Sequence, residues 1–415
     1  MNFVLAILVI IAVGYFIVKK YQAQGVLLIG GAILLLGGIL LNDSPVMAKS
    51  ATGSLYLDIF SQLSKNFIKT SGSLGLAIMI VSAFAKYMDH IGASTALVKL
   101  SIKPLQKLNS PYIVLALSYV IGQILNVFIP SASGLGVLLM VTVYPIVVSL
   151  GVSSLAATAV IGTSACLDLG PASGNAVLAS KTAEMDAALY FANYQIPVAI
   201  ATVIVITILH YFVNKKMDSK LEVAESKADL ESKEEDKQVP KFYAFLPIIP
   251  LLIILMFSPL TGSSIKIGVV EAMFMSITLI VAGEFFALGL TKIGVISALI
   301  DSTKSAGLGA QPMILVMTAI IVVSSILMGS GNAPFFAFAA LAPAVAASVD
   351  LNPIVMLMPM QLSAGIARSV SPITAVIVAV SGISGVSPFE VVKRTAIPML
   401  GGLIAVVVTN MVLFG

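Results

Sequence analysis

The chain has 415 residues, of which 59% are hydrophobic and 10% charged, and its formal net charge is +4. Its mean hydropathy is +1.07. Soluble globular domains carry about 25% charged residues, so this composition excludes an ordinary water-soluble fold. The apolar runs are continuous rather than alternating, which excludes a transmembrane β-barrel and predicts an all-α polytopic membrane protein.

The small numbers of cysteine and histidine limit the kinds of site that the chain can build. One cysteine, Cys166, excludes a disulfide framework, and two histidines are too few for a histidine-based metal site. We therefore expect no metal site and no cofactor, and the small net charge argues against nucleic acid as a partner. The sequence lacks G-x-x-x-x-G-K-[ST], H-E-x-x-H and a complete G-x-S-x-G, so we expect neither an ATP-driven pump nor an enzyme.

Apolar segments follow one another along the chain, and several are shorter than the roughly 20 residues that cross a bilayer. Residues 55–70 mix apolar and charged residues, which predicts a helix at the membrane surface. Residues 214–241 hold seven lysines and eight acidic residues, and we interpret them as a hydrophilic linker between residues 1–213 and 242–415. The apolar segments lie near residues 3–18, 25–41, 72–88, 111–129, 135–150, 153–167, 196–213, 242–260, 269–290, 312–328, 335–348, 353–367, 373–383 and 397–414.

The two parts of the chain repeat each other. Pro111 aligns with Pro312, and Pro171 aligns with Pro372, both at a separation of 201 residues. Internal duplication is typical of secondary transporters, whose binding sites lie between the repeats near the bilayer midplane. The sequence thus predicts two transmembrane repeats, 1–213 and 242–415. The second is shortened at its start, where about one span and one amphipathic segment have no counterpart.

Two pairs of apolar segments are interrupted by Gly, Pro and Ser at matching places in the two repeats. One pair comprises residues 129–136 and 328–334, and the other comprises residues 170–175 and 369–374. Non-helical backbone is tolerated at membrane depth only where it is buried or lines a cavity. The N-termini of half-helices offer N–H groups to an anion, and freed carbonyls and hydroxyls can hold a cation. Two facing N-termini suit a ligand with two carboxylates, and the alternative is tight packing through small residues with proline kinks.

One arginine stands directly before a break. Arg368 could bind a carboxylate through two parallel hydrogen bonds, and it stays charged in apolar surroundings. The alternative is structural, because Asp168 lies one residue from the position equivalent to Arg368 in the first repeat. An ion pair between Asp168 and Arg368 across the repeat axis would neutralise both charges.

Other charged residues in the apolar regions lead to two further expectations. Glu284 lies within an apolar run and is a candidate proton-coupling carboxylate, with a position at the end of a span as the alternative. Glu390, Lys393 and Arg394 stand close together, and we expect them to form a surface turn.

Six stretches of sequence together resemble one known family. They are residues 88–93 (MDHIGA), 110–112 (SPY), 133–140 (SGLGVLLM), 171–174 (PASG), 329–335 (GSGNAPF) and 387–395 (SPFEVVKRT). In this order they resemble the anaerobic C4-dicarboxylate carriers (Dcu, C-type branch) of the ion transporter superfamily. The resemblance implies a bacterial inner-membrane carrier with inverted repeats, re-entrant helical hairpins and broken transmembrane helices. It also implies movement of succinate, fumarate and malate by cation-coupled symport, efflux or exchange.

The breaks, Arg368 and this resemblance together define the candidate site. The expected substrate-binding residues are Ser133, Gly134, Ser173, Asn175, Ser330, Gly331, Asn332, Arg368, Ser371 and Thr374. The candidates for binding a coupling ion are Ser131, Ser133, Ser330, Asn332 and Glu284. The chain departs from relatives in two ways. Asn175 stands where relatives can carry an acid, which leaves both Na⁺ and H⁺ open, and relatives usually run longer, with the missing stretch between residues 260 and 271.

We therefore predict a secondary active transporter of C4-dicarboxylates that works by alternating access in the bacterial inner membrane. Its expected partners are a small dicarboxylate and the lipid bilayer, and a homodimer is one oligomeric state that we consider. The alternative is a carrier of another small organic anion, such as a hydroxy acid or an amino acid. A channel is less favoured, because the sequence shows no continuous polar or charged pore.

Overall fold

The computed structural model describes residues 2–19, 21–42, 45–47, 52–70, 87–88, 90–220, 240–256, 285–286, 288–294 and 309–415. Within these ranges the regular secondary structure is helical, without strands, which confirms the predicted all-α class. Several sequence predictions fall wholly or largely outside the described residues. They concern Glu284, the missing stretch between residues 260 and 271, most of the linker, and the apolar segments 72–88 and 269–290.

The first half of the chain contains a series of helices up to the linker. They are α1 (Asn2–Val18), α2 (Ala23–Asn42), α3 (Asp58–Thr70), α5 (Ala93–Ser101), η2 (Leu105–Lys107), α6 (Pro111–Phe128), α7 (Ala132–Thr142), α8 (Tyr144–Ser149), α9 (Ser154–Gly162), α10 (Gly174–Thr182), α11 (Ala187–Tyr190), the π-helical η3 (Phe191–Gln195) and α12 (Ile196–Asp218). The last helix, α12, extends to Asp218 and therefore includes the first residues that we had assigned to the linker.

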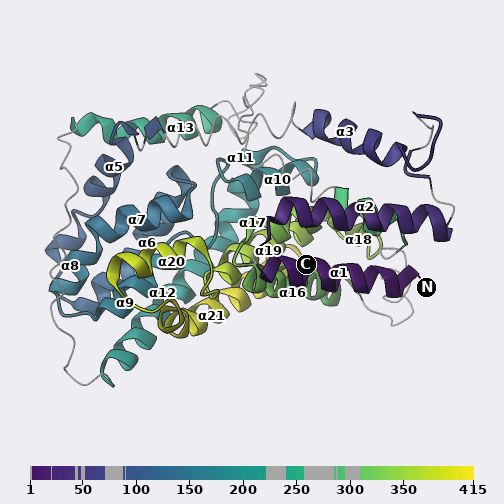
Figure 1. Cartoon of the computed structure of the whole chain (residues 1–415). Helices are drawn as coiled ribbons and strands as arrows, with labels where there is room; N and C mark the ends of the chain where they lie inside the picture. The colour runs from purple at the N-terminus through teal and green to yellow at the C-terminus, as the bar shows by residue number, and fades with distance from the viewer. Residues whose placement is uncertain are drawn as a thin grey trace.

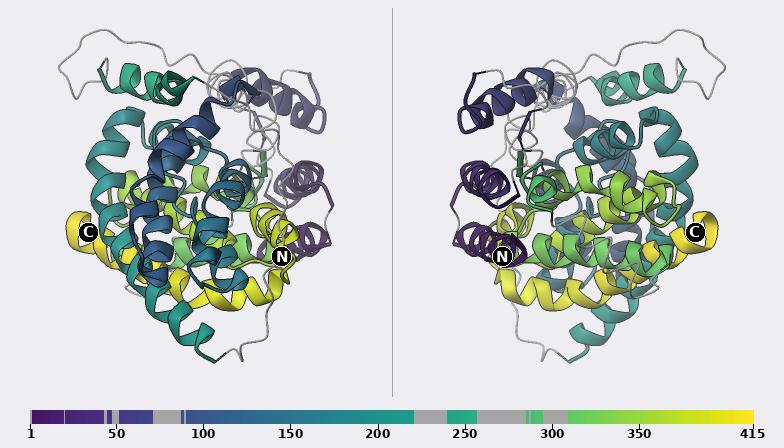
Figure 2. Two further views of the ribbon diagram at one scale, coloured as in Figure 1. Left: turned by 90° about the vertical axis from the view of Figure 1, so that its left-hand side faces the viewer. Right: turned by 90° about the vertical axis from the view of Figure 1, so that its right-hand side faces the viewer.

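The second half has a similar order of elements. They are η4 (Lys241–Ile248), α13 (Ile249–Met256), α16 (Ala310–Met328), α17 (Asn332–Phe338), η6 (Ala339–Leu341), α18 (Ala342–Ala347), α19 (Pro353–Arg368), α20 (Ala375–Ser384) and α21 (Pro388–Phe414). Both whole-molecule views place α3 and α13 along the same side of the helical bundle (Figures 1 and 2).

Prolines and polar caps determine where several helices begin. Pro111, Pro353 and Pro388 occupy the first turns of α6, α19 and α21, where a missing N–H costs no helical hydrogen bond. The side chains of Ser153 and Asn352 accept hydrogen bonds from backbone N–H groups in the first turns of α9 and α19. Such caps satisfy donors that the helix leaves unpaired.

Helix α19 lies at the centre of the structure. Every residue from 354 to 368 is buried, and the helix contacts α10, α16, α17, α18 and α21. Helices α12 and α21, the last of each half, pack against each other. The outer face of α12 exposes Ile200, Ile204 and Ile208, which lie four residues apart on one side of the helix. An apolar stripe that faces outward suits a helix in contact with lipid.

Four helical stretches are long and apolar enough to cross a membrane. Among the described residues these are Pro111–Phe128, Ala187–Asp218, Ala310–Met328 and Pro388–Phe414. Together with the outward apolar faces, they confirm a polytopic membrane protein.

Each half of the chain packs one of its short helices against the other half. Helix α20 of the second half packs on α7 and α9 of the first half, whereas α10 of the first half packs on α17 and α19 of the second. Figure 1 shows α20 beside the group of α6, α7 and α9, and α10 beside α17 and α19. This packing places the breaks that precede α10 and α20 in the interface between the halves.

Candidate functional site

Helices end and restart at the four places where Gly, Pro and Ser interrupt the apolar runs. Residues 129–131 separate α6 from α7, and residues 329–331 separate α16 from α17. Residues 163–173 separate α9 from α10, and residues 369–374 separate α19 from α20. The N-termini of α7, α10, α17 and α20 therefore all follow breaks, as the sequence predicts.

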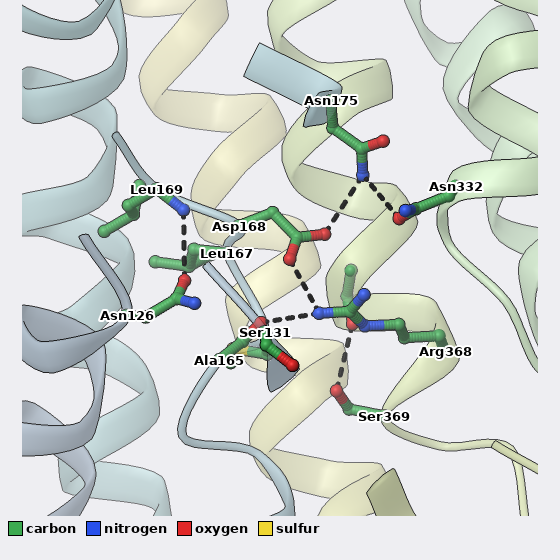
Figure 3. Close-up of polar contacts among 12 residues, drawn as sticks. Asn126, Ser131, Ala165, Leu167, Asp168, Leu169, Asn175, Asn332, Arg368 and Ser369 are labelled. Carbon is green, nitrogen blue, oxygen red and sulfur yellow. Dashed lines mark hydrogen bonds and ion pairs between the residues drawn. The ribbon is translucent and has the colours of Figure 1, made fainter. Parts of the chain in front are cut away.

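Arg368, the last residue of α19, forms an ion pair with Asp168 (Figure 3). Asp168 lies in the break between α9 and α10, residues 163–173, which we call the first-half break. Its Nη2 donates to Asp168 Oδ1 at 2.7 Å and to the carbonyl oxygen of Ala165 at 2.8 Å. Both side chains are about nine-tenths buried. Asp168 has φ = 47°, in the left-handed region that non-glycine residues rarely adopt. The structural alternative for Arg368, a pair across the repeats, is thus the geometry that the protein adopts.

Asn175 extends this network to the start of α17. Its Nδ2 donates to Asp168 Oδ2 at 3.0 Å and to Asn332 Oδ1 at 3.2 Å. Asn175 lies in the first turn of α10, and Asn332 is the first residue of α17. The two helix N-termini are therefore joined through side-chain amides, with Asn175 lying between Asp168 and Asn332 (Figure 3). The Oδ1 of Asn175 is buried without a hydrogen-bond partner.

Hydroxyl groups hold the break between α19 and α20, residues 369–374, which we call the second-half break. The Oγ1 of Thr374 donates to the carbonyl oxygen of Arg368 at 2.5 Å, and the Oγ1 of Thr395 donates to that of Ser369 at 2.9 Å. Ser371 is fully buried, and its Oγ has no hydrogen-bond partner. These contacts fix the backbone from which the Arg368 side chain leaves α19.

Two glycines allow the backbones to approach closely at this site. A Cβ at Gly365 would lie 2.3 Å from the carbonyl oxygen of Cys166 and 3.1 Å from Asp168 Oδ2. A Cβ at Gly331 would lie 2.8 Å from the carbonyl oxygen of Ala364. Any larger residue would push α19 away from the first-half break or from the start of α17.

The predicted site residues fall into three groups. Asn175, Asn332, Arg368 and Thr374 belong to one hydrogen-bonded network around Asp168, with Ser371 in the adjoining break. Ser173, Ser330 and Gly331 adjoin it in sequence, and Ser330 Oγ accepts a weak bond from the N–H of Ala333. Ser131, Ser133 and Gly134 lie at the start of α7, where Ser131 Oγ accepts from the N–H of Gly134 at 3.2 Å. Within the described ranges, no hydrogen bond joins this third group to the Asp168 network.

Several residues of the site were not identified from the sequence. Asn126 Oδ1 accepts from the N–H of Leu169, and Gln195 Oε1 accepts from the N–H of Gly170, both at 3.2 Å. Both side chains are fully buried amides in otherwise apolar helices. An amide in an apolar run is the signal that could have drawn attention to them, because a buried polar group requires a partner.

The expectation that Arg394 lies in a surface turn is wrong. Arg394 is 1% exposed, and its Nη1 donates to Asp218 Oδ1 at 2.5 Å. Asp218 also accepts from Ser153 Oγ at 2.7 Å and from the hydroxyl of Tyr112 at 3.1 Å. The helix α21 begins before Arg394 and turns its side chain inward towards the end of α12, which a local charge pattern does not reveal.

The site has donors and acceptors suited to small ions and carboxylates rather than to a metal cluster. Among the described residues, no three His, Cys, Asp or Glu side chains are grouped so that they could hold a metal. Comparison with known proteins adds the decisive observation. The model that describes the C4-dicarboxylate anaerobic carrier family, DcuC, matches residues 1–281 and 267–415. This chain belongs to that family.

Named relatives of the C4-dicarboxylate anaerobic carrier family cover nearly the whole chain. The anaerobic C4-dicarboxylate transporter DcuC of Escherichia coli K12 is 34% identical over 98% of this chain and 95% of its own length. The "probable anaerobic C4-dicarboxylate transporter DcuC" of Vibrio cholerae is 35% identical over 100% of this chain and 98% of its own length. That alignment spans 451 positions, so the Vibrio protein contains stretches that this 415-residue chain lacks.

Membership of this family confirms the resemblance that the sequence motifs indicate. It also confirms that the chain is a transporter, as expected from the duplicated halves and the broken helices. The two matched segments overlap at residues 267–281, close to the place where the comparison of the two halves found a missing stretch.

Proposed function

We propose that this chain carries C4-dicarboxylates such as succinate, fumarate and malate across the bacterial inner membrane by alternating access. The observation that carries the proposal is the buried network of Arg368, Asp168, Asn175 and Asn332, which joins three of the four breaks. Burying charged groups costs free energy even when they are paired, so ionisable residues inside an apolar membrane bundle are by default candidates for a functional site. The names of the E. coli and Vibrio cholerae relatives support the same substrate class.

The free donors at the site suit a carboxylate. In the described structure only Nη2 of Arg368 is engaged, so Nη1 and the buried Nε remain without a protein partner. A carboxylate could accept from Nη1, which points to the opposite edge of the guanidinium from Nε, and the second carboxylate of the same ligand could accept from the N–H groups of a facing helix N-terminus. Because Asp168 already balances the charge of Arg368, binding a dianion requires further positive charge.

We assign that charge to a coupling cation, Na⁺ or H⁺. The candidate oxygen ligands remain those of Ser131, Ser133, Ser330 and Asn332. The unpartnered oxygens Asn175 Oδ1 and Ser371 Oγ are further buried acceptors, one in the Asp168 network and one in the adjoining break. A cation held by hydroxyl and amide oxygens would neutralise part of the substrate charge and would thereby link the binding of the two.

The order of helices supports two inverted repeats, each with a re-entrant hairpin. Helices α10 and α20 begin at residues 174 and 375, and α11 and α21 begin at 187 and 388, so both pairs are 201 residues apart. After α6 the second limb, α7, has 11 residues, and after α16 the second limb runs through α17, η6 and α18 over Asn332–Ala347. Both are shorter than the roughly 20 residues that cross a bilayer. We propose that these pairs are the hairpins and that residues 214–241 link the repeats. A homodimer is the oligomeric state we would test first.

Counterflow of labelled succinate in proteoliposomes tests the function. We expect saturable exchange that unlabelled fumarate and malate inhibit, and dependence on either a Na⁺ or a pH gradient. Unsaturable flux would indicate a channel instead. Inhibition by a hydroxy acid or an amino acid, without inhibition by dicarboxylates, would indicate the alternative class of substrate.

A further inference from the structure

Three residues on one face of α19 contact the first-half break. Gln361, Gly365 and Arg368 are spaced by four and three residues, so they lie on the same side of the helix over two turns. Gln361 contacts the carbonyls of residues 167 and 168, Gly365 adjoins Cys166, and Arg368 binds residues 165 and 168. The break is therefore aligned along α19, with Gln361 at one end and Arg368 at the other.

Gln361 is fully buried, and all the hydrogen-bonding capacity of its amide is used. Its Nε2 donates to the carbonyl oxygens of Leu167 at 3.2 Å and of Asp168 at 3.4 Å. Its Oε1 accepts from Gln195 Nε2 at 2.6 Å and from the hydroxyl of Tyr190 at 3.0 Å. A side-chain amide has two donors and an oxygen that accepts twice, so Gln361 has no capacity left for substrate.

Gln195, which lies in the first half of the chain, contacts both Gln361 and the first-half break. It ends the π-helical turn η3, and its Oε1 accepts from the N–H of Gly170, whose φ is 98°. The two glutamines thus hold residues 167–170 from both sides, through the carbonyls at one end and the N–H at the other. Between these points lies Asp168, whose left-handed backbone is unfavourable for a non-glycine residue and needs such support.

This arrangement has no counterpart in the other repeat. The residues 201 positions away from Gln361 and Gln195 are Val160 and Ala396, which cannot form hydrogen bonds through their side chains. The second break is held instead by Thr374 and Thr395. The pair of glutamines is therefore specific to the break that contains Asp168 and is not a consequence of the duplication.

We propose that Gln361, together with Gln195, is a positioning residue for dicarboxylate binding. It touches no substrate. It holds the backbone of Asp168 so that the carboxylate engages only Nη2 of Arg368, which leaves Nη1 available to the substrate. This inference rests on the proposed function. If Gln361 is lost, the break can relax, Asp168 shifts along the guanidinium, and substrate affinity falls while the helices remain packed.

The test compares the kinetics of succinate counterflow in Gln361→Leu with those of the wild type. Leucine fills a similar volume but provides no hydrogen bond. We expect the KM for succinate to rise about tenfold or more, with the maximal rate within about threefold of the wild type per inserted protein. The matched control is Asn410→Leu, which removes a buried amide whose Nδ2 donates to the Val355 carbonyl at 2.9 Å, at the other end of α19. We expect that control to lower thermal stability without changing KM.

The outcomes are distinguishable. An unchanged KM in Gln361→Leu, or a loss of maximal rate alone that Asn410→Leu reproduces, would show a merely structural role and would overturn the inference. If Gln361→Leu does not insert, Gln195→Met, which loses the bond to Gly170, is measured in the same way and must raise KM. Absence of succinate counterflow in the wild type would instead refute the proposed function.

Discussion

Arg368 and Asp168 lie 200 residues apart in the sequence, yet their side chains meet at 2.7 Å in the interior of the protein. The pair joins the end of α19 to the break that follows α9, and Asn175 links it to Asn332 at the start of α17. Three segments from two halves of the chain are thus held together by this charged contact and the two hydrogen bonds of Asn175, so disruption of the pair should have measurable consequences.

Removing the charge of one partner should lower both the stability of the protein and its rate of succinate counterflow. Arg368→Gln leaves Asp168 buried without its cation, and breaking a buried pair in this way costs about 3–5 kcal/mol. It also removes the guanidinium that we assign to substrate. We expect succinate counterflow to fall at least about 100-fold, with normal insertion measured by membrane fractionation.

The double variant Asp168→Asn with Arg368→Gln separates the two roles of Arg368. If Arg368 binds substrate, the double variant should be as inactive as Arg368→Gln alone. If counterflow recovers when both charges are absent, the pair serves only mutual neutralisation, and Arg368 is not the substrate anchor.

The close contact at Gly365 predicts a steric effect. Gly365→Ala would place a Cβ 2.3 Å from the carbonyl oxygen of Cys166, and overpacking of this kind costs about 1–3 kcal/mol. We expect a lower thermal unfolding temperature and weaker succinate transport. The matched control is Gly382→Ala in α20, where, beyond the backbone of the helix itself, no atom of the described residues lies within 4 Å of the new Cβ. There alanine should stabilise the helix slightly, by about 0.5–1 kcal/mol; equal effects at both sites would contradict the observed packing.

The buried ion pair of Arg394 and Asp218 should stabilise the fold, whereas the exposed pair of Lys393 and Glu390 should contribute little. Arg394→Gln leaves a buried carboxylate without its cation, at a cost of about 3–5 kcal/mol. Lys393 pairs with Glu390 on the surface, with side chains 65% and 48% exposed, so Lys393→Gln should cost less than about 1 kcal/mol. Thermal unfolding in detergent measures both. Similar losses for the two variants would mean that Arg394 is not held as the structure shows.

The positions of the breaks could be predicted from the sequence because their cause is local. Gly, Pro and Ser interrupt apolar runs at residues 129–131 and 369–374, and the helices end there whatever surrounds them. Arg368 was identified for a similar reason, since it directly precedes a break. Local composition could not decide whether its partner is Asp168 or a substrate, because that depends on how α19 packs against the other half.

Residues whose role depends on long-range contacts could not be identified in this way. Gln195 and Gln361 are 166 residues apart, and nothing in either local sequence indicates that their amides meet. Arg394 was misinterpreted because three charged residues within five positions resemble a surface turn. Helical periodicity would have corrected this, since residues 391, 394, 395 and 398 form the buried face of α21.

The central claim, that a dicarboxylate binds at the breaks between the two halves, is tested most directly by substrate protection. Because Cys166 is the single cysteine of the sequence, a Cys166→Ser background allows Ser330→Cys to be alkylated selectively in the break between α16 and α17. In a variant that retains succinate counterflow, we predict that succinate and fumarate slow the alkylation of residue 330, whereas butyrate, with one carboxylate, does not. Alkylation at the same rate with and without saturating succinate would contradict a dicarboxylate site at the breaks.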